Sequence, residues 1–341
     1  ATNLNAVESF TEDDAVFSLT DIVVSEVDAG ETVTVTLTLS DSDAGTLSTA
    51  TSNAVTSTFV GGVWTVNGLV ADVNTLLAGV TFTPAGDYES DFTIATSVTD
   101  GETAAVTGTK TVTVTAVNDA PTATNMSGSE SFTEDDGAFS LTDIVVSEAD
   151  TGDTVTVTLT LYDTNAGTLS TSTSNAVTST FVGGVWTADG LVADVNTLLA
   201  GVTFTPAADY EDSFSVATSV TDGETVAVTG TKTFTVTAVN DAPTASNMSG
   251  AESFSEDGAT FSLTDIVVSE VDTGETVTVT LTLSDVNAGT LSTATSNGVT
   301  STFVGGVWSA DGLVADVNTL LAGVTFTPAA DYEDSFSVAT S

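Results

Sequence analysis

The chain repeats itself at a fixed interval, and this repeat constrains its fold more than any other feature. The string FVGGVW begins at Phe59, Phe181 and Phe303, so the period is 122 residues. VNDAP, which begins at Val117 and Val239, recurs in the same register. Such a period is too long for a solenoid turn and matches a whole domain. The predicted repeats are 1–121, 122–243 and 244–341.

Proline sets the phase of the repeat. Pro121 and Pro243 close the VNDAP strings, and proline suits a boundary better than an interior strand. The alternative phase begins repeats at TDGET and divides the chain as 1–97, 98–219 and 220–341. In the proline-based phase the sequence is a segment of a longer protein, and the third repeat stops at Ser341 before its last strand. We then expect an open sheet edge or an apolar cleft in that repeat.

Alternating threonine and apolar residues predict antiparallel strands. TVTVTLTLS at 32–40 places apolar side chains on one face, and TVTVTAV from Thr111 predicts another strand. A third strand is expected over 17–24, with a bulge near Asp21, and Gly61-Gly62 predicts a hairpin turn. Helical spacing predicts a short helix ending at Gly79, on the residues Leu69, Val73, Leu76, Leu77 and Val80. The fold class is all-β: tandem sandwiches, each with one short helix.

Composition excludes several function classes. The 341 residues hold 47 Asp and Glu against two Lys, with no Arg, His or Cys. So acidic a chain cannot neutralise nucleic-acid phosphates. It also has no imidazole base, no thiolate and no nitrogen or sulfur metal ligand. The sequence contains no apolar run of about 18 residues, so no membrane-spanning helix is predicted. Because the domains repeat almost unchanged, we predict a structural protein and no enzyme.

Three weaker candidates stand outside this pattern. Trp64 and its repeats, Trp186 and Trp308, fit core packing, with sugar stacking as the alternative. Asp41, Asp43 and Gly45 have half of a calcium-loop spacing but no closing Glu, which favours a plain turn. Lys110 and Lys232 lie in TGTK, where a surface ion pair is expected and a Lys–Asn isopeptide bond is the alternative.

Three further strings resemble the motifs of the cadherin repeat. EVDAGET begins at Glu26, SVTDGET at Ser97 and AVNDAP at Ala116, in the cadherin order. FTPAxDY followed by TDG and VNDAP is similar to the bacterial cadherin-like repeats of giant surface adhesins. Two departures stand out: Ala116 replaces the first Asp of the animal linker motif, and Glu26 replaces a loop Asp. Fewer calcium ions per junction than in the animal repeats are therefore expected.

The resemblance implies calcium at the junctions between repeats. Ca²⁺ takes about six to eight oxygen ligands, more than one short loop offers, so two domains and their linker share it. The implied ligands of the first junction are Glu12, Glu89, Asn118, Asp119, Glu148, Asp150 and Asp222. Those of the second are Glu134, Glu211, Asn240, Asp241, Glu270 and Asp272, and Asp87 and Asp209 are alternatives to Glu89 and Glu211. Better coordination is expected at the first junction, because the last ligand of the second lies beyond Ser341.

The functional prediction is a calcium-stiffened extender of a bacterial cell-surface adhesin, located outside the cell. Its partners are neighbouring repeats of the same chain. Two alternatives remain: repeats of an extracellular filament formed with like chains, and modules that bind a polysaccharide or one another.

Overall fold

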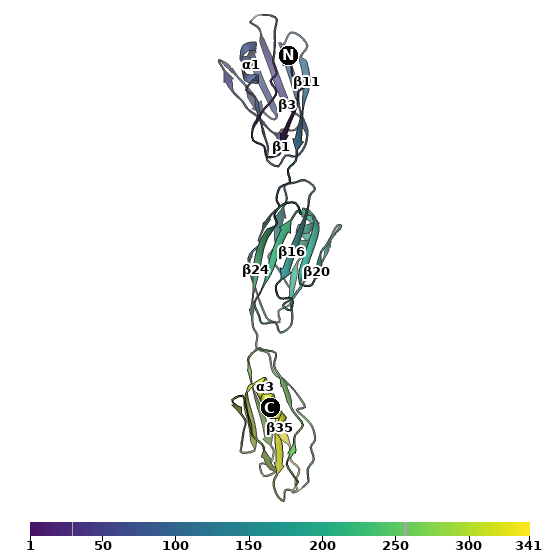
Figure 1. Ribbon diagram of the computed structural model, residues 1–341, viewed down its shortest axis with the longest axis vertical. Coiled ribbons are helices and arrows are strands. Elements are labelled where there is room, and N and C mark those ends of the chain that lie inside the picture. Colours follow the sequence, from purple (N-terminus) through teal and green to yellow (C-terminus); the bar gives the residue numbers. More distant parts are fainter. Residues whose placement is uncertain (29, 256–257) are drawn as a thin grey trace.

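The computed structural model describes residues 1–28, 30–255 and 258–341. Figure 1 shows three β-sandwiches in a row, joined end to end by short linkers. Each sandwich has its own hydrophobic core, and the cores involve residues from Leu4 to Val114, from Ala123 to Val236 and from Phe254 to Val338. Within the described part of the chain, no helix has the length and hydropathy needed to cross a membrane.

The first sandwich packs a six-stranded sheet, in the order β1-β11-β10-β3-β8-β7, on a three-stranded sheet, β2-β9-β4. A two-stranded ribbon, β5-β6, lies beside them. The bounds are β1 Val7–Thr11, β2 Phe17–Ser18, β3 Thr32–Leu39, η1 Ser42–Ala44, β4 Gly45–Leu47, β5 Thr51–Ser52, β6 Val55–Thr56, β7 Thr58–Val60, β8 Val63–Leu69, α1 Val70–Leu77, β9 Thr81–Pro84, β10 Phe92–Thr99 and β11 Val106–Thr115.

The second sandwich repeats this topology with the sheets β13-β24-β23-β16-β21-β20 and β14-β22-β17 and the pairs β18-β19 and β12-β15. The bounds are β12 Thr122–Thr124, β13 Gly128–Thr133, β14 Phe139–Ser140, β15 Val145–Ser147, β16 Thr154–Leu161, β17 Gly167–Leu169, β18 Thr173–Ser174, β19 Val177–Thr178, β20 Thr180–Val182, β21 Val185–Leu191, α2 Val192–Leu199, β22 Thr203–Pro206, β23 Phe214–Thr221 and β24 Val228–Thr237.

The third sandwich has the sheets β32-β33-β28-β35 and β26-β34-β29 and the pairs β30-β31 and β25-β27. The bounds are β25 Thr244–Ser246, β26 Phe261–Ser262, β27 Val267–Ser269, β28 Thr276–Leu283, β29 Gly289–Leu291, β30 Thr295–Ser296, β31 Val299–Thr300, β32 Thr302–Val304, β33 Val307–Leu313, α3 Val314–Ala322, β34 Thr325–Pro328 and β35 Val338–Thr340. A cleft is present in this sandwich, with a volume of about 740 Å³. Phe254, Phe261 and Phe336 line it together with the acids Glu252, Glu333 and Asp334, so its wall is mixed where an apolar one was expected.

Two sequence patterns act as predicted. The apolar residues of β3 are all buried, while its threonines are not. The Gly61-Gly62 turn joins β7 to β8, and both glycines have positive φ angles, 57° and 79°, which a two-residue hairpin needs. Strand period and turn chemistry therefore specify the register of this sheet.

The predicted helix is also present and is fixed to the sandwich by a side chain. α1 buries Val73, Leu76 and Leu77. Asn74 exchanges two hydrogen bonds with the backbone of Val24, at 2.8 and 2.9 Å. Asn196 and Asn318 make the same pair of bonds in the other sandwiches.

The prediction of one bulged strand over 17–24 is wrong. The structure has only β2 there, followed by an isolated bridge at Val23. The physical reason lies at Thr20, whose backbone N–H donates to Glu8 and whose carbonyl accepts from Lys110. Side chains thus take the hydrogen-bonding groups that a continuous strand would have used.

Candidate metal site

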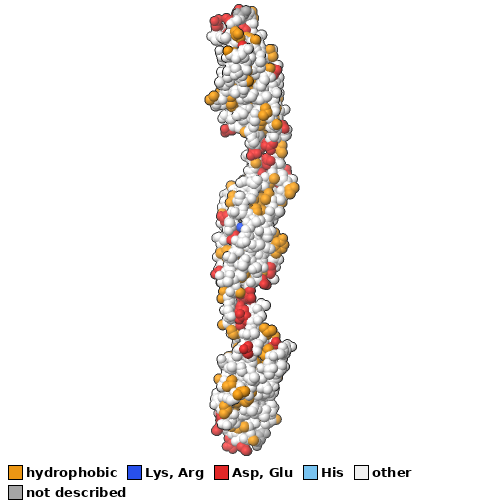
Figure 2. Space-filling view, turned by 90° about the vertical axis from the view of Figure 1, so that its left-hand side faces the viewer, with side chains coloured by type: hydrophobic (Ala, Val, Ile, Leu, Met, Phe, Trp, Pro, Cys, Tyr) orange, Lys and Arg blue, Asp and Glu red, His pale blue; other side chains and the backbone are white. Residues whose placement is uncertain are grey.

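Acidic side chains gather at the two necks between the sandwiches (Figure 2). At the first neck they come from the lower end of the first sandwich, from the linker, and from the upper end of the second. This is the arrangement expected for the first junction. The second neck repeats it one period later.

Glu12, at the end of β1, is the most buried acid of the first junction, with 3% of its surface exposed. Its Oε2 accepts the backbone N–H of Val117 at 3.0 Å, which ties the strand to the linker. Its Oε1 is buried and has no hydrogen-bond partner among the described residues. Burial raises the pKa of Glu12 against the effect of the Val117 bond, and Glu89, Asp150 and Asp119 raise it further.

Asp119 joins the linker to the second sandwich. Its backbone N–H donates to Asp150 Oδ2 at 2.7 Å. Its own Oδ2 is a second buried oxygen without a partner in the described chain. Burial raises the pKa of Asp119, and the negative charges of Asp13, Asp150 and Asp87 add to this effect.

Asn118 makes a further link across the junction. Its Nδ2 donates to Asp222 Oδ2 at 2.8 Å and to the carbonyl of Asp119 at 3.1 Å. Asp222 also accepts two backbone N–H groups, from Glu224 and Thr225. The Thr225 bond is the main reason that the pKa of Asp222 lies well below its usual range.

Glu89 and Glu148 complete the expected set from opposite sides. Glu89 Oε1 accepts the N–H of Thr151 at 2.9 Å, a contact from the first sandwich to the second. Glu148 Oε1 accepts from Ala149, while its buried Oε2 has no partner in the described regions. Burial is the main cause that raises the pKa of Glu148.

Two groups of carboxylates meet at Glu12. In each group, one oxygen from every member lies within 4.8 Å of the others, and the groups are Glu12, Asp87, Asp119 and Glu12, Glu89, Asp150. The structure therefore brings Asp87 and Glu89 together as neighbours of Glu12, where the sequence presented them as alternatives. Asp13, which follows Glu12, lies outside both groups, but its charge raises the pKa of Asp119, and it was not among the expected residues. Its signal was the acidic string TEDD, in which the expected set used only the Glu.

The second junction has nearly the same geometry. The matching groups are Glu134, Asp209, Asp241 and Glu134, Glu211, Asp272. Glu134 accepts from Val239 at 3.0 Å, Asp241 donates to Asp272 at 2.7 Å, and Glu211 accepts from Thr273 at 2.9 Å. Glu134 Oε1 and Asp241 Oδ2 are buried without partners in the part of the chain described. Glu270 accepts from Val271, and Asn240 donates to Asp241.

These carboxylates have no cationic side chain of their own. The sequence has two lysines and no arginine or histidine, and both lysines pair elsewhere, with Glu8 and Glu130. Buried carboxylates are costly unless they are paired or coordinate a metal ion. The donors are all oxygens, the ligand type that Ca²⁺ prefers. The site can therefore hold a hard divalent cation between the sandwiches.

The lysines themselves correct a prediction. Lys110 is 0% exposed and Lys232 2%, so neither makes the expected surface ion pair. Lys110 Nζ lies 2.9 Å from Glu8 Oε1 and 2.9 Å from the carbonyl of Thr20. A Lys–Asn isopeptide bond needs an asparagine side chain at Nζ, and the recorded partners are Glu8 and Thr20.

The other weak candidates are structural. Trp64 is 0% exposed, and its Nε1–H donates to the carbonyl of Ser48 at 3.0 Å, so its ring is not available to a sugar. Trp186 and Trp308 have the same burial and the same bond. Asp41 caps the turn η1 by accepting from Asp43 N–H at 2.9 Å. The core and turn interpretations are therefore confirmed.

The chain is similar to solved tandems of extracellular cadherin domains. Human CDH23 EC21-23 matches with a TM-score of 0.40 and 12% identity, over 98% of this chain and 97% of that one. Mouse Cadherin-23 EC22-24 matches with a TM-score of 0.32 and 14% identity, over 99% of this chain and 90% of that one. Protocadherin Gamma B2 domains 1-5 match with 0.33 and 12%, over 92% of this chain and 52% of that one, so the chain spans about half its length. No protein-family model and no curated protein matches the sequence.

Proposed function

We propose that this chain is a run of extender repeats, 1–121, 122–243 and 244–341, from an extracellular adhesin of the bacterial cell surface. Calcium at the two junctions stiffens the run. The observation that carries the proposal is the set of buried carboxylate oxygens without partners, supplied by both sandwiches and by the linker between them. Without a cation, these oxygens repel one another inside the neck.

The proposed ligands are the predicted junction residues. At the first junction Glu12 is the central ligand, because it belongs to both carboxylate groups. Asp87 and Glu89 contribute from the first sandwich, Asp119 from the linker and Asp150 from the second sandwich. Asn118, Glu148 and Asp222 orient the surrounding backbone and add oxygen donors. Bound calcium supplies positive charge and shared coordination across the neck.

The mechanical role follows from the connectivity. Each linker leaves the last strand of one sandwich and enters the next through its first strand, at opposite ends of the sandwich (Figure 1). A neck held by ligands from both sides bends less than a bare linker of the same length. The repeats then project whatever follows them away from the surface that anchors them.

Small-angle scattering of the 341-residue chain tests the proposal. In millimolar calcium we expect the scattering of a stiff rod and a raised melting temperature, because calcium binds the folded junction. With a chelator, the average length should fall and the melting temperature should drop. Magnesium at the same concentration controls for ionic strength. Identical scattering and melting curves in calcium and in chelator would contradict the proposal. An increase in the scattering mass of the particle on adding calcium would favour a filament of like chains.

A further inference from the structure

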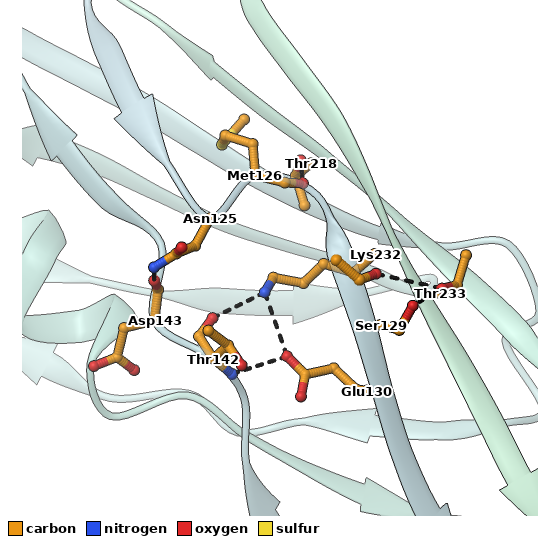
Figure 3. Close-up of polar contacts among 10 residues, drawn as sticks. Asn125, Met126, Ser129, Glu130, Thr142, Asp143, Thr218, Lys232 and Thr233 are labelled. Atoms are coloured by element: carbon orange, nitrogen blue, oxygen red, sulfur yellow. Dashed lines mark hydrogen bonds and ion pairs between the residues drawn. The ribbon is translucent and has the colours of Figure 1, made fainter.

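The second sandwich contains a closed ring of polar bonds inside its fold, and we call this ring the lysine staple. Lys232 Nζ donates to Glu130 Oε1 at 3.4 Å and to the carbonyl of Thr142 at 3.0 Å. Thr142 N–H in turn donates to the same Glu130 oxygen at 3.0 Å. Figure 3 shows the three residues arriving from different segments. Lys232 lies on β24, Glu130 on β13, and Thr142 on the connection that follows β14.

The first sandwich has the same staple in a tighter form. Lys110 Nζ donates to Glu8 Oε1 at 2.9 Å and to the carbonyl of Thr20 at 2.9 Å. The Lys110 side chain is 1% exposed and that of Glu8 7%. In the third sandwich Glu252 keeps the acid half and accepts Thr264 N–H at 3.0 Å. The staple therefore belongs to the repeat and is independent of the junction carboxylates.

The chain enters the second sandwich through the short strand β12, and the staple connects the strand that follows, β13, with the last strand, β24. β13 and β24 are parallel neighbours, paired from Gly128 with Lys232 to Thr133 with Thr237. β1 and β11 pair in the same way, from Val7 with Thr111 onward. Tension carried past the short strand β12 pulls the start of β13 and the end of β24 in opposite directions. Parallel neighbours loaded in this way slide along each other, so their ladder bonds carry the force together.

We propose that the lysine staple is a tension lock that resists this sliding. The inference rests on the proposed extender function, which places the chain under tension. Sliding β13 past β24 separates Lys232 from Glu130 and pulls Lys232 from Thr142 in the opposite sheet layer. The Lys232 charge, whose side chain is 3% exposed, is then left in the interior without partners. In the first sandwich the same motion separates Lys110 from Glu8, whose side chains are 1% and 7% exposed. Unpairing such charges is far costlier than losing a surface ion pair.

Neighbouring contacts hold the entering segment in place for the lock. Met126 O accepts Thr218 Oγ1 at 2.7 Å, and Asn125 Nδ2 donates to the carbonyl of Asp143 at 2.8 Å (Figure 3). A Cβ on Gly230 would lie 2.4 Å from that Met126 oxygen, so the backbones approach closely there. The segment just before β13 is thus tied to the sandwich close to Glu130, so a shift of β13 under load must also break these contacts.

Constant-force unfolding of the whole chain in calcium tests the lock. The variant replaces both staples by apolar pairs, Lys110→Met with Glu8→Leu and Lys232→Met with Glu130→Leu. Apolar replacement of a buried ion pair commonly preserves equilibrium stability, so the melting temperature should change little. We expect the lifetimes of two of the three unfolding events to fall by about tenfold or more, since charged hydrogen bonds are lost from the barrier. The third sandwich is the internal reference.

A core variant provides the matched control. Val35→Ala and Val157→Ala each leave a small cavity in a core, on the central strands β3 and β16, where both valines are 0% exposed. They should lower the melting temperature yet shorten the lifetimes under force much less than the staple variant. Lifetimes unchanged in the staple variant, or shortened equally in both, would overturn the lock. If the apolar pairs fail to fold, Glu8→Gln with Glu130→Gln removes only the charge and should show the same ordering.

The same experiment separates the lock from calcium stiffening. Junction stiffness appears as a calcium-dependent extension at low force, before any sandwich unfolds. The lock appears as the difference between variant and unmodified chains at one fixed calcium concentration. Loss of the first signal with the second intact would refute calcium stiffening alone, and the reverse result would refute the lock alone.

Discussion

Asp119 donates its backbone N–H to the carboxylate of Asp150 at 2.7 Å. This bond joins the linker directly to an acidic junction residue of the second sandwich. Asp241 and Asp272 repeat the relationship at 2.7 Å one period later. The hydrogen bond uses one oxygen of the acid. It also fixes the direction in which the linker meets the second sandwich, because the donor belongs to the backbone.

Asp150→Asn should separate this hydrogen bond from the charge. The asparagine oxygen can still accept from Asp119, but the junction loses one negative ligand. We expect the calcium affinity of the first junction to fall about tenfold or more, as measured by calorimetric titration. Asp43→Asn is the control, because the other repeats have Asn165 and Asn287 at that position. An equal loss in both variants would mean that net charge, not the site, sets the affinity.

The effect of Glu12→Gln on the stability of the first sandwich should change sign when calcium is added. Without calcium, the neutral amide removes a buried unpaired charge and can donate to a neighbouring acid. The free energy of unfolding of the first sandwich should then rise by about 1 kcal/mol. With calcium, the lost ligand should make the variant less stable than the unmodified chain. Paired thermal melts measure both cases, and the same sign in both would refute Glu12 as a ligand.

The pKa shifts predict how stability depends on pH when calcium is absent. The pKa values of Glu12, Asp119 and Glu148 are raised, chiefly by burial, so the folded chain binds protons more readily than the unfolded chain. Their effect is favourable in acid and is lost as the pH rises from the ordinary pKa, about 3.9 for Asp and about 4.3 for Glu, through the raised values. Asp222 acts oppositely, since its lowered pKa stabilises the fold at every pH above its ordinary range.

Chemical denaturation between acid and neutral pH checks this dependence. The calcium-free Glu12→Gln variant should lose less stability toward neutral pH than the unmodified chain, because it lacks one of the acids with a raised pKa. Saturating calcium should remove or reverse the trend, because its ligands must be deprotonated. An equal change in the variant and the unmodified chain would show that Glu12 does not repel its neighbours in the calcium-free junction.

Trypsin provides a local probe of the terminal strands. Lys110 and Lys232 are the only tryptic sites of the chain, and they lie buried within β11 and β24. Cleavage therefore requires these strands to detach. We expect the calcium-bound chain to resist trypsin, the chelated chain to be cut faster, and the denatured chain to give three fragments by mass spectrometry. Rapid cleavage of the calcium-bound chain would contradict the burial of both lysines.

Much of the fold follows from side-chain periods. The alternation in β3 and the Gly61-Gly62 turn specify face and register, because both are local properties of the backbone. The interruption after β2 was not predictable in this way. Its cause is Thr20, whose carbonyl bonds a lysine 90 positions away in the sequence. Hydrogen bonds that distant segments supply leave no local pattern.

The burial of Lys110 could have been predicted from the strand pattern, although a charged residue is ordinarily placed at the surface. In TGTKTVTVT, Lys110 has the same strand parity as Val112 and Val114, so alternation places it on the inner face. Glu8 and Phe10 share a face in β1 by the same rule. A charged residue is ordinarily assigned to the surface, and the pairing of β1 with β11 was needed to bring the two charges together.

The central claim is that calcium fixes the angle between neighbouring sandwiches, and a distance distribution across one neck tests it most directly. The chain has no cysteine, so spin labels can be placed uniquely at Thr113→Cys on β11 and Val145→Cys on β15, two exposed positions. Double electron–electron resonance should give one narrow distance distribution in calcium and a clearly broader one in chelator. Distributions of equal width in both conditions would contradict calcium stiffening.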